Sequence, residues 1–391
     1  MEAINARAGM RGARRGRAGF LRRLGEAEPR GASRPPARHR KIGASPCFAE
    51  RFLNSPDWRL CVAPMIDVTD RHCRFFHRLL APRARLYTEM ITTGALLHGN
   101  VSRHLDFDDS EHPVALQLGG SEPDALAQAA RLGAKWGYDE INLNCGCPSE
   151  RVQKGAFGAC LMAEPGLVAD CVKAMQDAVD LPVTVKHRLG LDYDESYGFV
   201  RDFVGKLHDA GCRVFIAHAR NAVLKGLSPK DNREIPPLRY DVVKRLKQDF
   251  PDSIFVLNGG LADAAQSVRA ANEFDGVMLG RAAWHTPRVL SEVSLQLWPS
   301  VRLPGDAQVV DAMMAYAARQ VAQGVPLRVM TRPMLGLVNG QAGARRWRRM
   351  LSDPARLAEN DPALIYEAWR ATQRRPAGQQ ALATDAAPAA G

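Results

Sequence analysis

The sequence lacks a hydrophobic run long enough to cross a membrane. None of its apolar stretches approaches the roughly 18 to 20 residues that a spanning helix needs. No secretory pattern of charged, apolar and small residues opens the chain either. With 391 residues, of which 46% are hydrophobic, the chain can bury a sizeable core. We therefore expect a folded cytoplasmic protein that does not engage a membrane.

Cysteine spacings of the zinc-binding kind are also absent. The eight cysteines are scattered, and Cys145 and Cys147 are the closest pair, separated by one residue. One intervening residue is a poor spacing for a structural zinc knuckle, so we expect no metal site. We expect no disulfide scaffold either.

Acidic residues are scarce at the amino terminus. Residues 1–41 hold eleven Arg and one Lys against three Glu, in a chain whose net charge is +11. Large apolar residues are few there, so we expect residues 1–50 to be a disordered basic extension. It could attract RNA phosphates. An inessential extension, an over-called start site and an organelle transit peptide are the alternatives.

No dinucleotide-binding glycine motif follows the first apolar run, which weakens the case for a Rossmann fold. The chain has instead a series of short apolar runs, each followed by a segment with helical period. The predicted strands are Leu60–Met65, Ala84–Thr88, Val114–Leu118, Glu140–Leu143, Val183–Lys186, Val214–Ala217, Ile254–Leu257 and Gly276–Leu279.

Eight such units favour an α/β fold of the (β/α)8 TIM barrel type over an open doubly wound sheet, which usually has fewer strands. The helices predicted between them include Pro123–Trp136, Leu167–Val179, Tyr197–Asp209, Leu238–Asp249 and Ala262–Ala270. Further on, Asp306–Gln323 and Arg345–Leu351 predict a smaller all-helical domain. We place the barrel at residues 55–295, the helical domain at 300–372 and a disordered tail at 376–391.

A TIM barrel places its chemistry at the carboxyl ends of its strands, so unusual polar residues should directly follow the apolar runs. They do so after seven of the runs. The positions are Ala63–Asp67, Gln117, Asn142–Ser149, Lys186–Arg188, His218–Arg220, Asn258–Gly260 and Gly280–Arg281. A set in such close register with the strands is hard to assign to core packing alone.

Glycines after the last two predicted strands favour a phosphate site. Gly259, Gly260 and Gly280 would let backbone N–H groups approach an anion, and Arg281 would complete its neutralisation. Two ordinary turns are the alternative.

Lys186, His218 and Gln117 would project into the barrel mouth, where a planar heterocycle could lie. Flavin mononucleotide (FMN) suits them, because a reduced flavin carries negative charge and offers carbonyl and ring-nitrogen hydrogen-bond sites. A structural role is the alternative for a single Lys or His at a strand end.

Cys147 follows a glycine and precedes a proline, whereas an inert cysteine belongs in an apolar core. A cysteine near a flavin face can act as a general acid. In reduction of the uracil C5–C6 double bond, hydride passes from flavin N5 to C6 and a proton must reach C5 from the opposite side. We choose Cys147 as the proton donor and Cys145 as a structural residue.

These stretches resemble the tRNA-dihydrouridine synthase family over roughly residues 55 to 355. The motifs, in family order, are A-P-M-I-D at Ala63–Asp67, Gly146–Ser149 followed by Arg151, Val152, Gln153 and Gly155, then Val185–Arg188 and His218–Arg220. The resemblance implies a flavin-dependent oxidoreductase with an FMN barrel, a helical tRNA-binding domain, and NADPH or NADH as reductant. It implies Cys147 as the catalytic residue and FMN contacts at Pro64, Met65, Gln117, Lys186, His218, Asn258, Gly259, Gly260, Gly280 and Arg281.

Two further segments resemble the A branch of the family, which acts on uridines 20 and 20a. They are Gly226–Leu238 and Asn339–Arg349. In the first, Lys230 and Arg233 could grip phosphates beside the target nucleotide. In the second, Arg345 and Arg348 share a helical face and could contact RNA together, with a solvated helix face as the alternative.

The predicted reaction is FMN-dependent, NADPH-driven reduction of uridine to 5,6-dihydrouridine in the tRNA D-loop, by a monomer whose helical domain binds the tRNA elbow. A stacked base cannot present C6 to the flavin, so the uridine must be extruded into the barrel mouth, where Asn144 and Arg220 could hold it. Cys145 departs from the branch, in which Val is common at this position. A disulfide with Cys147, or a shared role, therefore stays open.

Two rival functions are compatible with parts of this pattern. An FMN barrel acting on a free pyrimidine, similar to dihydroorotate dehydrogenases, explains the flavin residues but leaves the basic helical domain without a task. A non-catalytic RNA-binding protein that has lost its flavin is opposed by the intact Cys147, Lys186 and His218.

Overall fold

The computed structural model describes residues 58–149, 152 and 155–373. The predicted extension at residues 1–50 and the predicted tail at residues 376–391 lie outside this part of the chain, as do motif residues Arg151 and Gln153. Among the helices described, none combines the length and the apolar character that crossing a bilayer requires.

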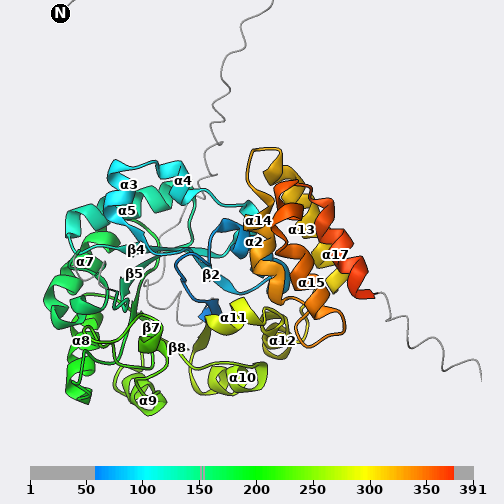
Figure 1. The fold of residues 1–391 in the computed structure, drawn as a ribbon. Coiled ribbons are helices and arrows are strands. Elements are labelled where there is room, and N and C mark those ends of the chain that lie inside the picture. The colour runs from blue at the N-terminus through cyan, green and yellow to red at the C-terminus, as the bar shows by residue number, and fades with distance from the viewer. Residues whose placement is uncertain (1–57, 150–151, 153–154, 374–391) are drawn as a thin grey trace, which may run out of the picture. The chain divides into compact units, whose positions relative to one another are not determined.

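A closed ring of eight parallel strands forms the centre of the described chain (Figure 1). The strands are β1 Leu60–Val62, β2 Arg85–Tyr87, β4 Val114–Gly119, β5 Glu140–Cys145, β6 Val183–His187, β7 Val214–His218, β8 Ile254–Asn258 and β9 Gly276–Leu279. Each of these eight strands pairs with the next one in this order. The last strand, β9, also pairs with β1, which closes the ring. The short β3 (Ile91–Thr92) adds to the carboxyl end of β4. The predicted TIM barrel and its eight strands are confirmed.

Helices alternate with these strands. They are α2 Arg71–Leu80, α3 Thr93–His98, α4 Val101–Leu105, α5 Pro123–Trp136, α7 Pro165–Ala178, α8 Tyr197–Asp209, α9 Tyr240–Asp249, α10 Ala264–Glu273, α11 Arg281–His285 and α12 Arg288–Leu297. The predictions for α5 and α8 match residue for residue. Helix α10 begins two residues later than predicted, because the Asp263 carboxylate caps it by accepting from the Gln266 N–H.

Successive residues of each strand face opposite sides of the barrel wall, which produces two cores. Inside the ring a small core contains Cys61, Tyr87, Ala115, Ile216, Val256 and Met278, among others. Outside it, a larger core between strands and helices contains their sequence neighbours, such as Leu60, Leu86, Leu116, Phe215 and Leu257. The same alternation decides which polar residues point into the barrel.

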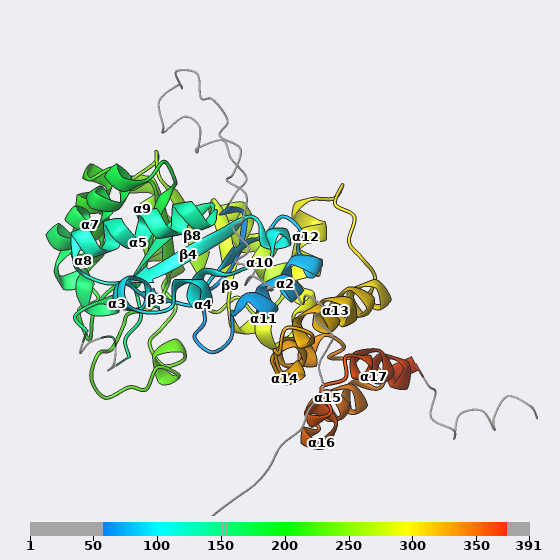
Figure 2. The same ribbon diagram turned by 90° about the horizontal axis from the view of Figure 1, so that it is seen from above.

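The described region after α12 consists of helices joined by loops, as predicted. The helices are α13 Asp306–Val321, α14 Leu327–Thr331, α15 Ala344–Leu351, α16 Pro354–Ala358 and α17 Ala363–Gln373. They lie together, with α13 against α2 (Figures 1 and 2). The Tyr316 ring of α13 stacks on Phe75 of α2 at a centroid distance of 3.9 Å, and its hydroxyl lies 2.8 Å from Nδ1 of His72.

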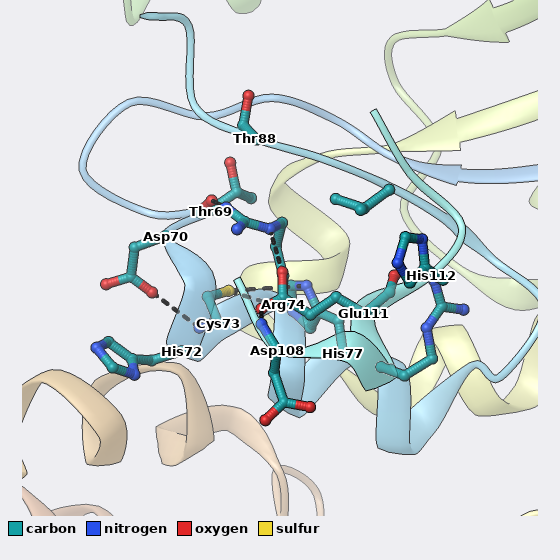
Figure 3. Close-up of polar contacts among 12 residues, drawn as sticks. Thr69, Asp70, His72, Cys73, Arg74, His77, Thr88, Asp108, Glu111 and His112 are labelled. Atoms are coloured by element: carbon teal, nitrogen blue, oxygen red, sulfur yellow. Dashed lines mark hydrogen bonds and ion pairs between the residues drawn. The ribbon is translucent and has the colours of Figure 1, made fainter. Parts of the chain in front are cut away.

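A buried ion pair ties α2 to the loop before β4 (Figure 3). Arg74 Nε donates to Glu111 Oε2 at 2.6 Å, with both side chains buried. Asp70 begins the helix by accepting from the Cys73 N–H. Helix α2 is therefore fixed to the barrel on one side and, through Tyr316, to the helical region on the other.

Candidate active site

Polar residues from several strands gather at the barrel mouth. The inward-facing residues at or just beyond the carboxyl ends of the strands are Met65, Gln117, Asn144, Lys186, His218, Asn258 and Gly280, and Pro64 adjoins Met65. The strand register sets Asn144 beside Lys186 and His218 beside Asn258. The structure thus brings the predicted set to one end of the barrel.

Gln117 and Asn144 are joined inside the mouth. Asn144 Nδ2 donates to Gln117 Oε1 at 2.8 Å, and Gln117 Nε2 donates to Asn142 Oδ1 at 2.7 Å. All three side chains are buried. Asn144, for which the sequence suggested a contact with the uridine, is therefore engaged on its donor side by the barrel interior.

Cys147 lies on the loop that follows β5, where hydrogen bonds hold its backbone. Asn144 Oδ1 accepts from the Gly146 N–H at 3.1 Å and from the Cys147 N–H at 3.0 Å. The Cys147 carbonyl accepts from the Ala159 N–H at 2.9 Å. The thiol donates to Ser149 Oγ at 3.5 Å, and the residue is partly exposed. The backbone of Cys147 is thus held in place, while part of the residue stays exposed.

Lys186 is an amine with a neutral hydrogen-bond partner. Its Nζ donates to Asn258 Oδ1 at 3.0 Å, and Asn258 Nδ2 donates to the Met278 carbonyl at 2.8 Å. Burial, followed by the charge of Arg188, lowers the pKa of Lys186 to about 7, and a thiolate at Cys147 acts in the opposite direction. A bound anion would favour the ammonium form.

His218 lies among cations. Burial lowers the pKa of His218 well below its ordinary value. Four positive charges act in the same direction, on Arg188, Lys186, Arg220 and Arg233. A neutral imidazole can donate one hydrogen bond and accept another, while the surrounding cations attract phosphate groups and other anions.

The turn after β8 uses two glycines in left-handed conformations. The φ angles of Gly259 and Gly260 are 109° and 71°. The Tyr240 hydroxyl donates to the Gly259 carbonyl at 2.6 Å, and a Cβ on Gly259 would lie 2.7 Å from Cδ2 of His218. Successive N–H groups in such a turn can converge on an anion. After β9, Gly280 directly precedes α11.

Arg281 is half-exposed and already paired. Its Nη1 donates to Glu234 Oε1 at 2.7 Å and its Nη2 donates to the Arg233 carbonyl at 3.3 Å. An exposed pair of this kind contributes little to stability, so a bound phosphate could replace the Glu234 carboxylate at small cost.

The loop after β7 exposes Lys230 and Arg233. Buried Asn232 organises it by exchanging two hydrogen bonds of 2.8 Å with the backbone of Val223. Arg220, the second suggested uridine contact, is buried, and its guanidinium donates to loop carbonyls, including that of Glu234 at 3.1 Å.

Arg188 is a residue to which the sequence analysis gave no role. Its side chain is buried, and burial lowers its pKa to about 10. Its Nε donates to the Gly146 carbonyl at 3.2 Å, and its Nη1 donates to the carbonyls of Asn221 at 3.0 Å and Asn232 at 2.9 Å. Arg188 therefore joins the loop after β5 to the loop after β7. The sequence signal that could have indicated this role is the position of Arg188, two residues after Lys186.

Arg345 and Arg348 are exposed on α15, whose Trp347 and Leu351 are buried. Arg348 also donates to Asn339 Oδ1, and Asn339 Nδ2 donates to the His285 carbonyl at 2.6 Å. The Asn339–Arg349 segment therefore connects the helical region to α11, next to the barrel mouth.

Cys145 and Cys147 have different surroundings. Cys145 packs in the outer core, where burial raises the pKa of its thiol. The described cysteines are all free, so no disulfide links the two. Across the described residues, no three His, Cys, Asp or Glu side chains are grouped so as to hold a metal ion.

Thr184 and Glu140, which lie below the mouth, were not foreseen as part of the site. Asn142 Nδ2 donates to Thr184 Oγ1 at 2.7 Å, and the Thr184 hydroxyl donates to Glu140 Oε1 at 2.5 Å. The available signal was the alternation in β5, where Glu140, Asn142 and Asn144 occupy every second position. Three polar residues on one face of a strand indicate a polar partner on that face.

Comparisons with known proteins found a matching family model and several similar proteins. The family model described as "Dihydrouridine synthase (Dus)" matches residues 61–373. Two similar proteins named tRNA-dihydrouridine(20/20a) synthase come from Pseudomonas syringae pv. tomato, 56% identical over 79% of this chain and 93% of that protein, and Escherichia coli O6:H1, 52% identical over 82% and 98%. A structure of morphinone reductase in complex with tetrahydroNAD matches with a TM-score of 0.43 and 14% identity over 64% of this chain and 90% of that one, which is too distant to support a functional argument.

Proposed function

Because the chain belongs to the dihydrouridine synthase family, we propose that it reduces uridine to 5,6-dihydrouridine in the D-loop of transfer RNA. The observation that carries the proposal is the position of Cys147 at a cationic barrel mouth, on a loop that Asn144 and Arg188 hold. A thiol so placed can deliver a proton to a base that enters the mouth. The relatives are named for positions 20 and 20a, and we propose the same positions here.

The residues at the mouth fit FMN. Lys186 is a desolvated amine bonded to a neutral amide, so an anion beside it would stabilise its charged form. The residues that would hold FMN are Pro64, Met65, Gln117, Lys186, His218, Asn258, Gly259, Gly260, Gly280 and Arg281. When bound and reduced by NADPH, FMN would supply the hydride that reaches C6 of uracil.

Cys147 holds the proton that C5 receives, and its loss leaves a thiolate. Burial lowers the pKa values of Lys186 and Arg188, and both residues are close enough for that thiolate to oppose the lowering. The two cations therefore stabilise the charge that appears on sulfur as the proton leaves.

The exposed basic residues serve the RNA. Lys230 and Arg233 lie on the loop after β7 and would contact phosphates beside the extruded uridine, while Arg345 and Arg348 would contact the tRNA elbow. Phosphate contacts fix the position of the nucleic acid. The distance between the Lys230–Arg233 pair and the Arg345–Arg348 pair therefore selects the base that reaches Cys147. A monomer carries both pairs of basic residues.

Mass spectrometry of D-loop fragments tests the proposal, with unmodified tRNA incubated with purified protein, FMN and NADPH. A gain of two hydrogens at uridine 20 or 20a is the expected result. Turnover of free uridine or dihydroorotate without any change in tRNA would contradict the proposal and favour a free-pyrimidine enzyme.

A further inference from the structure

Hydrogen bonds run without a break from the Cys147 loop to a carboxylate deep in the barrel. Four side chains lie between them, here named the amide chain: Asn144, Gln117, Asn142 and Thr184. The chain ends on Glu140, and all of its members are buried. In each of its bonds the donor lies on the Cys147 side and the acceptor on the Glu140 side.

This common direction has a cause in Glu140. An amide side chain has one donor end and one acceptor end, so a row of amides can run either way unless one end is fixed. A carboxylate accepts hydrogen bonds and donates none. Thr184 must therefore give its proton to Glu140 and accept from Asn142, and the remaining amides follow.

The Glu140 carboxylate is itself held on both oxygens. Trp58 Nε1 donates to Oε2 and the Tyr87 hydroxyl donates to Oε1, each at 2.8 Å, and Arg85 Nη1 lies 3.2 Å from Oε2. Burial raises the pKa of Glu140, and Arg85 together with the hydrogen bonds opposes that rise. Two oxygens that both accept are the arrangement of a carboxylate rather than of a carboxylic acid.

The other end of the amide chain decides how the loop is held. Asn144 Oδ1 accepts from two backbone N–H groups, those of Gly146 and Cys147. A reversed Asn144 would set its own NH2 group against these two donors. Hydrogen bonds in a chain polarise one another in a low-dielectric interior, so the carboxylate strengthens the bonds at the far end as well.

We propose that Glu140, acting through the amide chain, is a positioning residue that holds Cys147 in the orientation from which it donates its proton. The catalytic part of this inference rests on the proposed function. The positioning part concerns the loop alone and can be measured without any turnover.

Thr184→Val tests the proposal in the holoenzyme, because valine has the shape of threonine but neither accepts from Asn142 nor donates to Glu140. At saturating tRNA we expect the rate of dihydrouridine formation to fall about tenfold or more. The KM for tRNA should stay unchanged, and both variant and wild type are measured with saturating FMN, because Gln117 is a member of the chain as well as a predicted FMN contact. Alkylation of Cys147 by iodoacetamide, followed by peptide mass spectrometry, should become about threefold faster or more, because the loop is released.

Two matched variants separate positioning from general damage. Thr184→Ser keeps the hydroxyl and should retain the wild-type rates. Thr331→Val removes a buried hydroxyl in α14, outside the amide chain, and should change neither rate. If Thr184→Val does not fold, Thr184→Cys, whose thiol is a weak donor and acceptor, carries the same prediction.

Wild-type turnover and wild-type alkylation in Thr184→Val would overturn the inference, and so would an equal loss in Thr331→Val. Failure of the proposed function looks different. In that case the wild-type protein makes no dihydrouridine, while the alkylation rates still report whether the amide chain holds Cys147.

Discussion

At the scale of single residues, the position of each thiol decides its chemistry. Cys147 and Cys160 are both partly exposed, but Cys147 is near enough to Lys186 and Arg188 to influence their pKa values, whereas the Cys160 thiol donates to the Phe157 carbonyl. Because a general acid contributes roughly 10²- to 10⁴-fold, Cys147→Ala should lower dihydrouridine formation by about 100-fold or more. Flavin content and flavin reduction by NADPH should be unchanged.

Product formation by Cys147→Ala is measured by mass spectrometry of the tRNA, and Cys160→Ser is the matched control. The control should keep the wild-type rate. Full product formation by Cys147→Ala would refute the assignment of this residue as the acid.

Lys186 should make the FMN-free protein less stable at neutral pH than at alkaline pH. Its pKa is about 7 in the fold and 10.5 ordinarily, so between these values the unfolded chain binds a proton that the folded chain does not. Stability therefore rises with pH through this window, and the penalty is complete below pH 7. Lys186→Met has no such penalty, so it should be more stable than the wild type at pH 7. This difference in the free energy of unfolding should shrink by on the order of 2 kcal/mol from pH 7 to pH 10, after allowance for partial exposure.

Guanidinium titrations of both proteins at several pH values measure this difference. The loss of the bond to Asn258 does not depend on pH and cancels from the trend. Lys225→Met is the control, because Lys225 is exposed and its removal changes the charge without relieving a burial penalty. A stability difference that stays constant with pH would show that Lys186 is charged in the fold throughout this range.

At the scale of elements, the turn after β8 depends on glycine. Gly259→Ala combines a φ of 109° with a Cβ that would lie 2.7 Å from His218, so the turn must shift. Strain of this kind costs about 1 to 3 kcal/mol. We expect the Kd for FMN, measured by fluorescence quenching, to rise about tenfold or more, since this turn would bind the phosphate.

Gly324→Ala is the control for the strain alone. Gly324 has a φ of 84° but open space around its Cβ position, and it lies in the loop after α13. It should lose some stability and keep its affinity for FMN. Equal affinities in the two variants would argue against a phosphate at the turn after β8.

The elements also show what the sequence could and could not predict. All eight ring strands were predicted, because each is a short apolar run followed by a segment with helical period. The roles of Thr184 and Arg188 were missed, because their partners lie 44 and 42 residues away in the chain and meet them only through the strand register and the loops. Periodicity predicts which face a residue occupies, but not which distant residue it meets there.

At the scale of the whole molecule, contacts at α2 and at α11 are among those that hold the helical region against the barrel. Tyr316 of α13 packs on α2, and Asn339 donates to the His285 carbonyl of α11. Helix α2 begins just after the loop that carries Met65, and α11 begins just after Gly280. The basic residues of α15 are therefore connected to the mouth through elements that carry predicted FMN contacts.

If tRNA binds along this face, removing Arg345 and Arg348 should weaken its binding through charge. The double change to Ala should raise the Kd for tRNA about tenfold and lower the slope of log K against log salt by about 1 for each arginine. Flavin reduction by NADPH should not change.

Arg346→Ala removes a charge from another face of α15, where Arg346 donates to the Ala371 carbonyl, and should have a smaller effect for each charge removed. Filter binding across a salt series measures both quantities. Equal losses per charge in the two variants would mean that α15 contributes only a diffuse positive field, whereas a face-specific loss would mean that Arg345 and Arg348 contact phosphates directly.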